Sequence, residues 1–254
     1  MKTVDYPECF ARFYDVIYAR LRSGIDTDFF LEEIDACRSK VLEIGTGTGR
    51  FFTAALERGA DIYGIDVSTS MINILKQKLS PAEYFRVKED DCITMDAGIS
   101  FGLILAPFRV FSHIIEVEQQ LAALNNIARH LEPGGKFIFD LYVPNPKMIY
   151  EGLDNVLDFS GEYEPGKKLQ RFSTMRADLV KQVSYVTMRF VWDEGKKQRT
   201  ESWDFMMRFY FRYEIEHLIA LSDLELISIY GDYQRTPLNE ASKDFIVVCR
   251  KKMG

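Results

Sequence analysis

Apolar residues recur along the chain with two different periods, and each period predicts a different kind of element. Spacings of three and four, typical of one helix face, predict helices over 7–23, 26–36, 50–58, 70–79, 119–131 and 213–221. Short apolar runs predict strands over 40–44, 61–65, 83–87, 101–106, 136–141, 224–230 and 244–250. Strands that alternate with helices in this way indicate a sheet covered by helices on both faces. The pattern therefore predicts a doubly wound α/β fold with a mostly parallel, seven-stranded sheet.

Residues 145–212 interrupt this alternation. Within them, residues 155–212 show no helical periodicity and are rich in Tyr, Phe, Val, Met and Trp. The strands and the hairpin turn expected here are 170–176, 180–192, the turn 193–196, and 197–211. We therefore predict a core formed by residues 1–144 and 213–254, with a small antiparallel sheet inserted at 145–212.

Composition and charge narrow the class of protein. The 254 residues carry a net charge of −6, so there is no global basic field to attract nucleic acid. Four cysteines are scattered, without a CxxC pair or a histidine at ligand spacing, so reduced thiols and no metal site are expected. The first residues have no apolar signal-peptide core, and no apolar run has the length of a membrane span. We expect a soluble, cytoplasmic protein that binds neither nucleic acid nor membrane.

A glycine-rich turn follows the first predicted strand. Gly45, Gly47 and Gly49 alternate with threonines, and such a turn lets the backbone pass closely against a bound nucleoside. Glu43 lies two residues before the first glycine, where its carboxylate suits a cationic or hydroxyl-bearing ligand and would repel a pyrophosphate. The GxGxG spacing also differs from the GxGxxG of dinucleotide-binding turns. A dinucleotide is therefore the less favoured ligand.

Further candidates stand where the next strands end, since ligands of open parallel sheets bind beyond the carboxyl ends of the strands. Asp66 follows the turn by about 20 residues, where a carboxylate can accept both ribose hydroxyls; a helix-cap role is the alternative. Asp91, with Asp90 as the second choice, can accept the exocyclic amine of an adenine, although a solvated acidic loop would have the same sequence. Ala106 ends the fourth strand, beside the expected reactive end of the ligand.

Taken together, these residues resemble the class I S-adenosylmethionine-dependent methyltransferases, over residues 36–141 and again over 213–250. The resemblance implies a Rossmann-like fold, S-adenosyl-L-methionine as cofactor and methyl transfer as the activity. It assigns cofactor binding to Glu43, Gly45, Thr46, Gly47, Gly49, Asp66, Val67, Met71, Asp91, Cys92 and Ala106. In this family the glycine turn wraps the methionine end, and residues 131–135 match the turn before the fifth strand. Gly102 and the Asp223-Leu224 pair depart from the family pattern at positions that the cofactor chemistry does not need.

His113 is the candidate general base. It follows the fourth strand, near the expected methyl donor, and an attacking amine or hydroxyl must lose a proton during or after attack. The alternative is a helix-start residue packed against the loop. Tyr14 resembles aromatic residues that related enzymes fold over the cofactor, with core packing as its alternative. Arg109 is the candidate for binding an anionic group of the substrate, or else a solvated loop residue.

The inserted segment bears on the substrate. Its place after the fifth strand resembles the antiparallel lid of methyltransferases that act on aminosugar nucleotides and glycine-like amines. Six basic residues are candidates for holding a phosphate-bearing substrate, namely Lys167, Lys168, Arg171, Arg176, Lys181 and Arg189. Exposed strands commonly carry lysine to deter edge pairing, and this second explanation is favoured. The aromatic content of the segment also fits a homodimer interface.

The leading hypothesis is a methyltransferase that acts on a nitrogen or oxygen of a small-molecule methyl acceptor. A nucleic-acid methyltransferase is disfavoured by the acidic charge. It is also disfavoured because Ala106-Pro107-Phe108-Arg109 stands where an Asn/Asp-Pro-Pro-Tyr or Pro-Cys motif would follow the fourth strand. A non-catalytic cofactor-binding or scaffold protein of the same fold is the remaining alternative.

Overall fold

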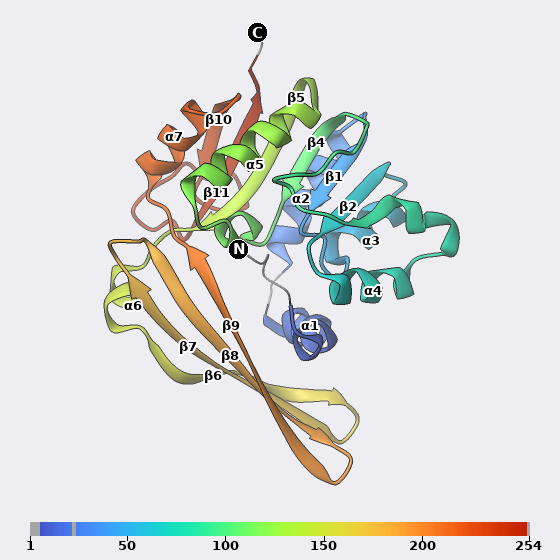
Figure 1. Cartoon of the computed structure of the whole chain (residues 1–254), viewed down its shortest axis with the longest axis vertical. Helices are drawn as coiled ribbons and strands as arrows, with labels where there is room; N and C mark the ends of the chain where they lie inside the picture. Colours follow the sequence, from blue (N-terminus) through green and yellow to red (C-terminus); the bar gives the residue numbers. More distant parts are fainter. Residues whose placement is uncertain (1–5, 22–23, 253–254) are drawn as a thin grey trace.

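Two sheets organise the chain (Figure 1). The computed structural model describes residues 6–21 and 24–252. Its helices are α1 (Glu8–Leu21), α2 (Ile25–Ala36), α3 (Arg50–Glu57), α4 (Thr69–Lys78), α5 (Val117–His130), α6 (Pro146–Glu151) and α7 (Arg212–Ala220), with 3₁₀ helices η1 (Pro81–Arg86) and η2 (Val110–His113). The core strands are β1 (Val41–Ile44), β2 (Ile62–Asp66), β3 (Val87–Glu89), β4 (Phe101–Ala106), β5 (Leu131–Tyr142), β10 (Leu224–Tyr230) and β11 (Asp244–Lys251).

The larger sheet confirms the predicted fold class. Its seven strands follow the order β10-β11-β5-β4-β1-β2-β3. The pairs from β3 to β5 are parallel, and β11 runs antiparallel to both of its neighbours. Buried side chains form one cluster on each face of this sheet, as expected for a sheet covered by helices on both sides. The strand order changes direction at β1, so the turn after β1 lies where such folds bind ligands.

The inserted sheet contains β6 (Leu153–Glu164), β7 (Lys167–Asp178), β8 (Val183–Glu194) and β9 (Lys197–Arg208), paired antiparallel in that order. Three of these strands and the turn between β8 and β9 were predicted. The strand β6 and the short helix α6 were not. Most side chains of β6 are exposed and only Phe159 is buried, so its apolar pattern is too weak to indicate a strand. Pairing with β7 decides its conformation.

Two local predictions were wrong. Residues 83–87 are not a strand: η1 covers most of them, and β3 begins only at Val87. Pro81 follows Ser80, and the Glu83 carboxylate accepts hydrogen bonds from the Ser80 N–H (3.1 Å) and hydroxyl (2.8 Å), an arrangement that starts a helical turn. The turn expected at 132–135 lies inside β5, as an irregularity in its register with β4.

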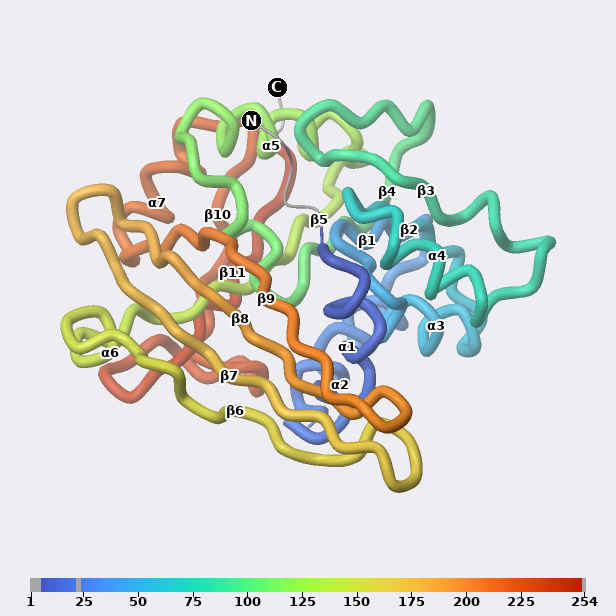
Figure 2. The backbone as a smooth tube through the Cα atoms, turned by 60° about the horizontal axis from the view of Figure 1, so that its bottom comes forward, coloured from blue at the N-terminus to red at the C-terminus, as the bar shows by residue number. Residues whose placement is uncertain are grey.

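The helix α1 lies between the ends of the core strands and the inserted sheet (Figures 1 and 2). Phe10, Phe13 and Ile17 of α1 share one apolar cluster with Met71 of α4 and with aromatic residues of the inserted sheet. This third cluster joins the two sheets through α1. Within the ranges that the structure describes, no helix is long and apolar enough to cross a membrane. The cytoplasmic location and the homodimer stay predictions.

Candidate active site

A cavity of about 920 Å³ opens at the carboxyl ends of β1, β2 and β4. Strands β8 and β9 of the inserted sheet and the helix α1 form its other walls. In α1, Phe10, Tyr14 and Tyr18 face the cavity because residues four apart share a helix face. A cavity of this size is in the range that binds small molecules and cofactors.

The glycine turn forms the floor of the cavity on the core side. Gly45 and Gly47 line it with φ angles of 71° and 56°, a conformation that glycine adopts without steric cost. A Cβ atom on Gly45 would meet the side chain of Val110 at 2.4 Å, whereas one on Gly47 would have no neighbour closer than 3.9 Å. The turn thus leaves an open cradle above Gly47, which a ligand can occupy.

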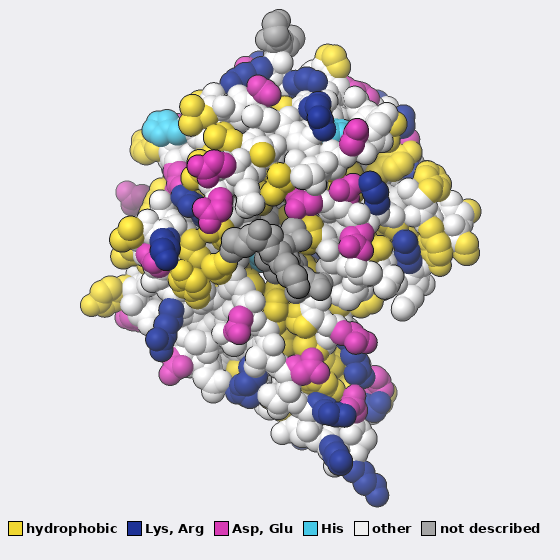
Figure 3. Space-filling view, viewed as in Figure 1, with side chains coloured by type: hydrophobic (Ala, Val, Ile, Leu, Met, Phe, Trp, Pro, Cys, Tyr) yellow, Lys and Arg dark blue, Asp and Glu magenta, His cyan; other side chains and the backbone are white. Residues whose placement is uncertain are grey.

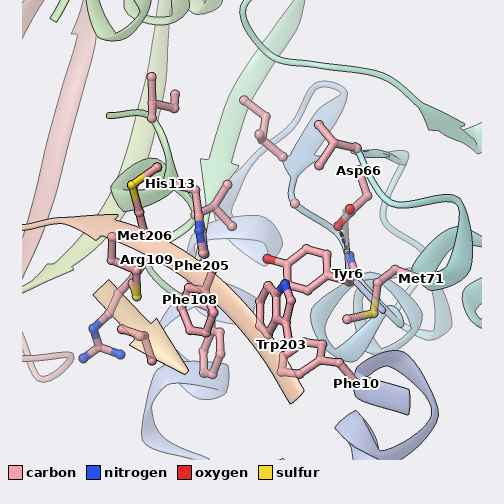
Figure 4. Close-up of a pocket in the computed structure, with 18 of the residues that line it drawn as sticks. Tyr6, Phe10, Asp66, Met71, Phe108, Arg109, His113, Trp203, Phe205 and Met206 are labelled. Atoms are coloured by element: carbon pink, nitrogen blue, oxygen red, sulfur yellow. Dashed lines mark hydrogen bonds between the residues drawn. The ribbon is translucent and has the colours of Figure 1, made fainter. Parts of the chain in front are cut away.

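Asp66 is fixed beside this cradle (Figure 4). Its Oδ2 accepts the Gly47 N–H at 2.8 Å, and its Oδ1 accepts the Ser68 N–H at 2.9 Å. The side chain is only 5% exposed, and burial raises its pKa, while the backbone hydrogen bonds oppose that rise. A carboxylate has about four lone-pair positions, so acceptor sites remain for two hydroxyls. Asp66 was expected to bind ribose or to cap α4; the side chain that caps α4 is that of Ser68.

Four of the predicted cofactor residues are buried behind the cavity wall and do not line it: Glu43, Thr46, Gly49 and Ala106. The Glu43 carboxyl is 1% exposed and accepts a hydrogen bond from the Thr46 hydroxyl at 3.3 Å. Burial raises its pKa to about 8, and Arg50 lowers it in part. Glu43 therefore supports the turn from behind and is mostly protonated at neutral pH.

The raised pKa of Glu43 gives a stability prediction. In the folded chain Glu43 keeps its proton up to a pKa of about 8, whereas its ordinary value is 4.5. The contribution of protonated Glu43 to the free energy of unfolding is therefore complete below pH 4.5 and is lost as the pH rises through about 8. We expect the melting temperature to fall between pH 6.5 and about 9 more steeply in the wild type than in Glu43→Gln. If the melting temperatures of the wild type, Glu43→Gln and the exposed control Glu89→Gln fall in parallel with pH, the raised pKa assigned to Glu43 is wrong.

The residues after β3 form the far side of the cofactor region. Asp90 is paired with Lys88 at 2.7 Å. Asp91 lines the cavity, and its Oδ1 accepts the Ile93 N–H at 2.9 Å, so its second oxygen remains for a ligand. Burial raises the pKa of the Cys92 thiol to about 12 and keeps it protonated. Val67 and Met71 line the same region.

His113 lines the opposite part of the cavity, at the end of η2. Burial lowers its pKa to about 4, so the imidazole is neutral at physiological pH. Its Nδ1 is buried and has no hydrogen-bond partner among the described residues. The ring lies 6.3 Å from that of Tyr6 and 5.8 Å from that of Phe205, centroid to centroid. Because Nδ1 has almost no surface on the cavity, a ligand there would meet the other atoms of the ring.

Tyr14 and Arg109 also line the cavity, but Arg109 is already engaged. The Tyr14 ring packs on that of Tyr18, with centroids 4.5 Å apart. The Arg109 guanidinium forms an ion pair with Asp244 at 2.5 Å and points away from the other labelled side chains (Figure 4). The backbone N–H of Arg109 donates a hydrogen bond to the Asp140 carboxylate at 3.2 Å. This geometry gives no support to the predicted anion-binding role of Arg109.

Sequence reasoning missed an aromatic wall formed by Tyr6, Phe10, Trp203 and Phe205. The Trp203 ring lies 4.8 Å from Tyr6, 4.5 Å from Phe10 and 4.0 Å from Phe205, between centroids. All four residues line the cavity, between Asp66 and His113 (Figure 4). The alternation of Trp203 and Phe205 along β9 places both side chains on one face of the strand. This alternation indicates a strand face, but no local feature of the sequence indicates that this face lines the cavity.

The helix α1 is tied directly to the glycine turn. The Asp15 carboxylate accepts the Thr48 hydroxyl at 2.6 Å and the Lys78 ammonium at 2.6 Å. Lys78 also donates to the Thr48 carbonyl at 2.8 Å. The cover of the cavity is therefore anchored to the turn that forms its floor.

Comparisons with known proteins agree with this arrangement. A family described as a methyltransferase domain matches residues 41–135. An uncharacterized methyltransferase of Bacillus mycoides is 30% identical over 136 residues, which are 54% of this chain and 56% of that protein. The chain thus matches little more than half the length of this relative.

Solved structures of similar fold extend over nearly the whole chain. One is an S-adenosylmethionine-dependent methyltransferase from Clostridium acetobutylicum, with a TM-score of 0.77, 18% identity, and coverage of 96% of this chain and 98% of that one. Another is the sugar N-methyltransferase KedS8 from a Streptoalloteichus species, with a TM-score of 0.73, 19% identity, and coverage of 94% and 93%. Residues 41–135 thus match a methyltransferase domain, and the chain as a whole has the fold of these methyltransferase structures.

Proposed function

We propose that the protein transfers a methyl group from S-adenosylmethionine to a nitrogen or oxygen of a small molecule. The observation that carries the proposal is that one cavity has the Gly47 cradle with Asp66 and Asp91 on one side and the neutral imidazole of His113 on the other. The cradle and the two carboxylates suit the adenosine part of the cofactor. The imidazole suits a nucleophile that carries an N–H or O–H.

The residues present fit the cofactor. Asp66 has acceptor positions left for ribose hydroxyls, and Asp91 has an oxygen left for the adenine amine. Val67 and Met71 supply apolar contacts for the base. When bound, S-adenosylmethionine supplies a methyl group on a positively charged sulfur; a nucleophile's lone pair bonds to the methyl carbon and the carbon–sulfur electron pair leaves with the sulfur.

The protein's own contribution is alignment and exclusion of water, which can supply much of the acceleration of such a displacement. Neutral His113 can accept a hydrogen bond from the N–H or O–H of the nucleophile and so direct its lone pair. With a pKa of about 4, His113 orients the nucleophile better than it holds the proton that is lost, which passes on to water. Tyr14 and Phe10 of α1 cover the cavity above these groups.

A small acceptor is supported by the walls of the cavity, because α1 and the strands β8 and β9 face the core strand ends across it. A nitrogen acceptor is supported by the similar fold of KedS8, which is named a sugar N-methyltransferase. A scaffold protein of the same fold would bind the cofactor and turn over no acceptor, so binding and turnover have to be measured separately.

Calorimetric titration with S-adenosylmethionine and S-adenosylhomocysteine tests the cofactor assignment. We expect both to bind, and we expect Asp91→Ala to weaken binding by about tenfold, the loss of one hydrogen bond to a charged group. Glu89→Ala is the matched control, since Glu89 is an exposed carboxylate of β3 that does not line the cavity. Lack of binding of either compound at millimolar concentration would refute the proposal. An equal loss in the two variants would refute the role of Asp91.

A further inference from the structure

We propose that the methyl acceptor is an aromatic or otherwise apolar amine that carries no phosphate or carboxylate. The inference rests on the proposed function and concerns the part of the cavity that is farthest from Asp66. It follows from the side chains of β8 and β9, from the charges along the cavity, and from the places of the basic residues of the inserted sheet.

The wall provided by the inserted sheet is apolar. Met188 pairs with Trp203 and Val186 pairs with Phe205 across β8 and β9, so these four side chains lie on one face of the sheet. All four line the cavity, and Ile114 lines it after η2. Burial of apolar surface against such a wall is worth about 25 cal/mol per Å². The wall therefore favours a ring or a hydrocarbon body over a sugar.

The charges along the cavity oppose an anionic acceptor. Among the described residues that line it, Arg109 is the sole cation, and its charge is matched by Asp244 at 2.5 Å. Among the acidic residues on the lining, Asp90 is paired with Lys88 and Asp204 accepts the Thr187 hydroxyl, which leaves the carboxylates of Asp66 and Asp91. A phosphate needs arginine, lysine or a cluster of N–H donors, and it would be repelled by these carboxylates.

The basic residues that suggested a phosphate-bearing substrate are placed elsewhere. None of the six lines the cavity. Arg171 bonds to Asp158 at 2.8 Å, Arg189 bonds to Asn155 at 2.8 Å, and Lys167 bonds to Glu164 at 2.5 Å. Figure 3 shows Lys and Arg side chains gathered at the far tip of the inserted sheet, where the β6–β7 and β8–β9 turns lie. Arg171 is buried behind the cavity wall, where it also donates to the Tyr18 hydroxyl at 3.1 Å, and none of the six charges faces the acceptor.

An amine suits this lining better than an alcohol. The aromatic faces of Trp203 and Tyr6 and the surrounding carboxylates attract an ammonium group. The amine attacks in its neutral form, beside the imidazole of His113. Its lone pair would form the bond to the methyl carbon as the carbon–sulfur bond breaks and its electron pair leaves with the sulfur, and the methylated nitrogen then loses one proton to water. These groups place the amine beside His113, with the apolar body on Trp203 and Phe205.

Tyramine and tyramine phosphate test the inference as a matched pair, because they share ring and amine and differ by the phosphate. We expect tyramine to bind the protein loaded with S-adenosylhomocysteine at least about tenfold more tightly, measured by calorimetry. With S-adenosylmethionine present, S-adenosylhomocysteine should be released faster with tyramine than with tyramine phosphate. Equal or tighter binding of tyramine phosphate, or binding of neither amine by a protein that binds S-adenosylhomocysteine, would overturn the inference alone. Failure to bind S-adenosylhomocysteine would refute the proposed function instead.

Two variants test the residues. Trp203→Leu should weaken tyramine binding by about tenfold and Trp203→Tyr should restore most of it. Trp192→Leu is the control, since Trp192 belongs to the same apolar cluster and does not line the cavity. A third variant, Met188→Lys, tests the same wall without removing an aromatic residue. Its added cation should raise the affinity for tyramine phosphate relative to that for tyramine. Equal effects of the two Trp→Leu changes, or an unchanged preference in Met188→Lys, would contradict the inference.

Discussion

Replacement of Asp66 by alanine is expected to lower the affinity for S-adenosylmethionine by about 100-fold. The two hydroxyls of a ribose would donate to one carboxylate, and each hydrogen bond to a charged group contributes about 1.5 kcal/mol or more. The change also removes the acceptor that holds the Gly47 N–H at 2.8 Å, so the glycine turn loses its support on the same side. Calorimetric titration with the cofactor measures the loss.

Two further variants separate the ligand contact from the support of the turn. Asp66→Asn keeps an oxygen for the backbone and loses the charge, so its affinity should lie between wild type and Asp66→Ala. Glu89→Ala removes an exposed carboxylate from the neighbouring strand β3 and should leave the affinity unchanged. If the affinity of Asp66→Ala stays within about threefold of wild type, the ribose assignment is wrong.

Replacement of His113 by alanine is expected to lower kcat by about 100-fold while cofactor affinity stays nearly unchanged. The reason is that His113 lies across the cavity from Asp66 (Figure 4) and is proposed to orient the nucleophile, whose misalignment can cost about 10²-fold in rate. Turnover is measured as S-adenosylhomocysteine release with an acceptor amine. A variant that keeps wild-type turnover would remove His113 from the mechanism.

The pH profile supplies a second reading of the same residue. Because the pKa of His113 lies near 4, its protonation should not reduce the rate between about pH 7 and 5. An inflection near pH 6.5 that is absent in His113→Gln would show that the imidazole is not desolvated as the structure has it. His217→Ala, which removes an exposed histidine of α7, is the control for both experiments.

Local pattern predicted β1, β2, β4 and β11 well because most side chains of these strands are buried, on both faces of the sheet. The continuous apolar run of β4, Phe101–Ala106, has the same bounds in sequence and structure. The prediction was wrong at 83–87, where a proline and a capping carboxylate outcompete strand propensity. It missed β6, whose exposed side chains carry no periodic signal and whose backbone pairs with a strand that follows it.

The two sides of the cavity also differ in how well they could be predicted from the sequence. The turn at Gly45–Gly49 and the acids after β2 and β3 come from one short stretch of chain, so their spacing is readable. Tyr6, His113 and Trp203 are far apart in sequence and meet because α1 and the inserted sheet close over the strand ends. No residue spacing encodes such a meeting. The engagement of Arg109 by Asp244 was equally hidden, since the partners are 135 residues apart.

The sequence by itself determined the parallel core and the glycine turn with the acids at the strand ends, since these depend on local periodicity and on short distances along one backbone. Tertiary structure alone decided which charges face the acceptor. Ion pairing neutralised Arg109 and turned Asp90 toward Lys88, while burial made His113 neutral. Charge and protonation depend on neighbours in space and on access to water, and only the folded chain sets both.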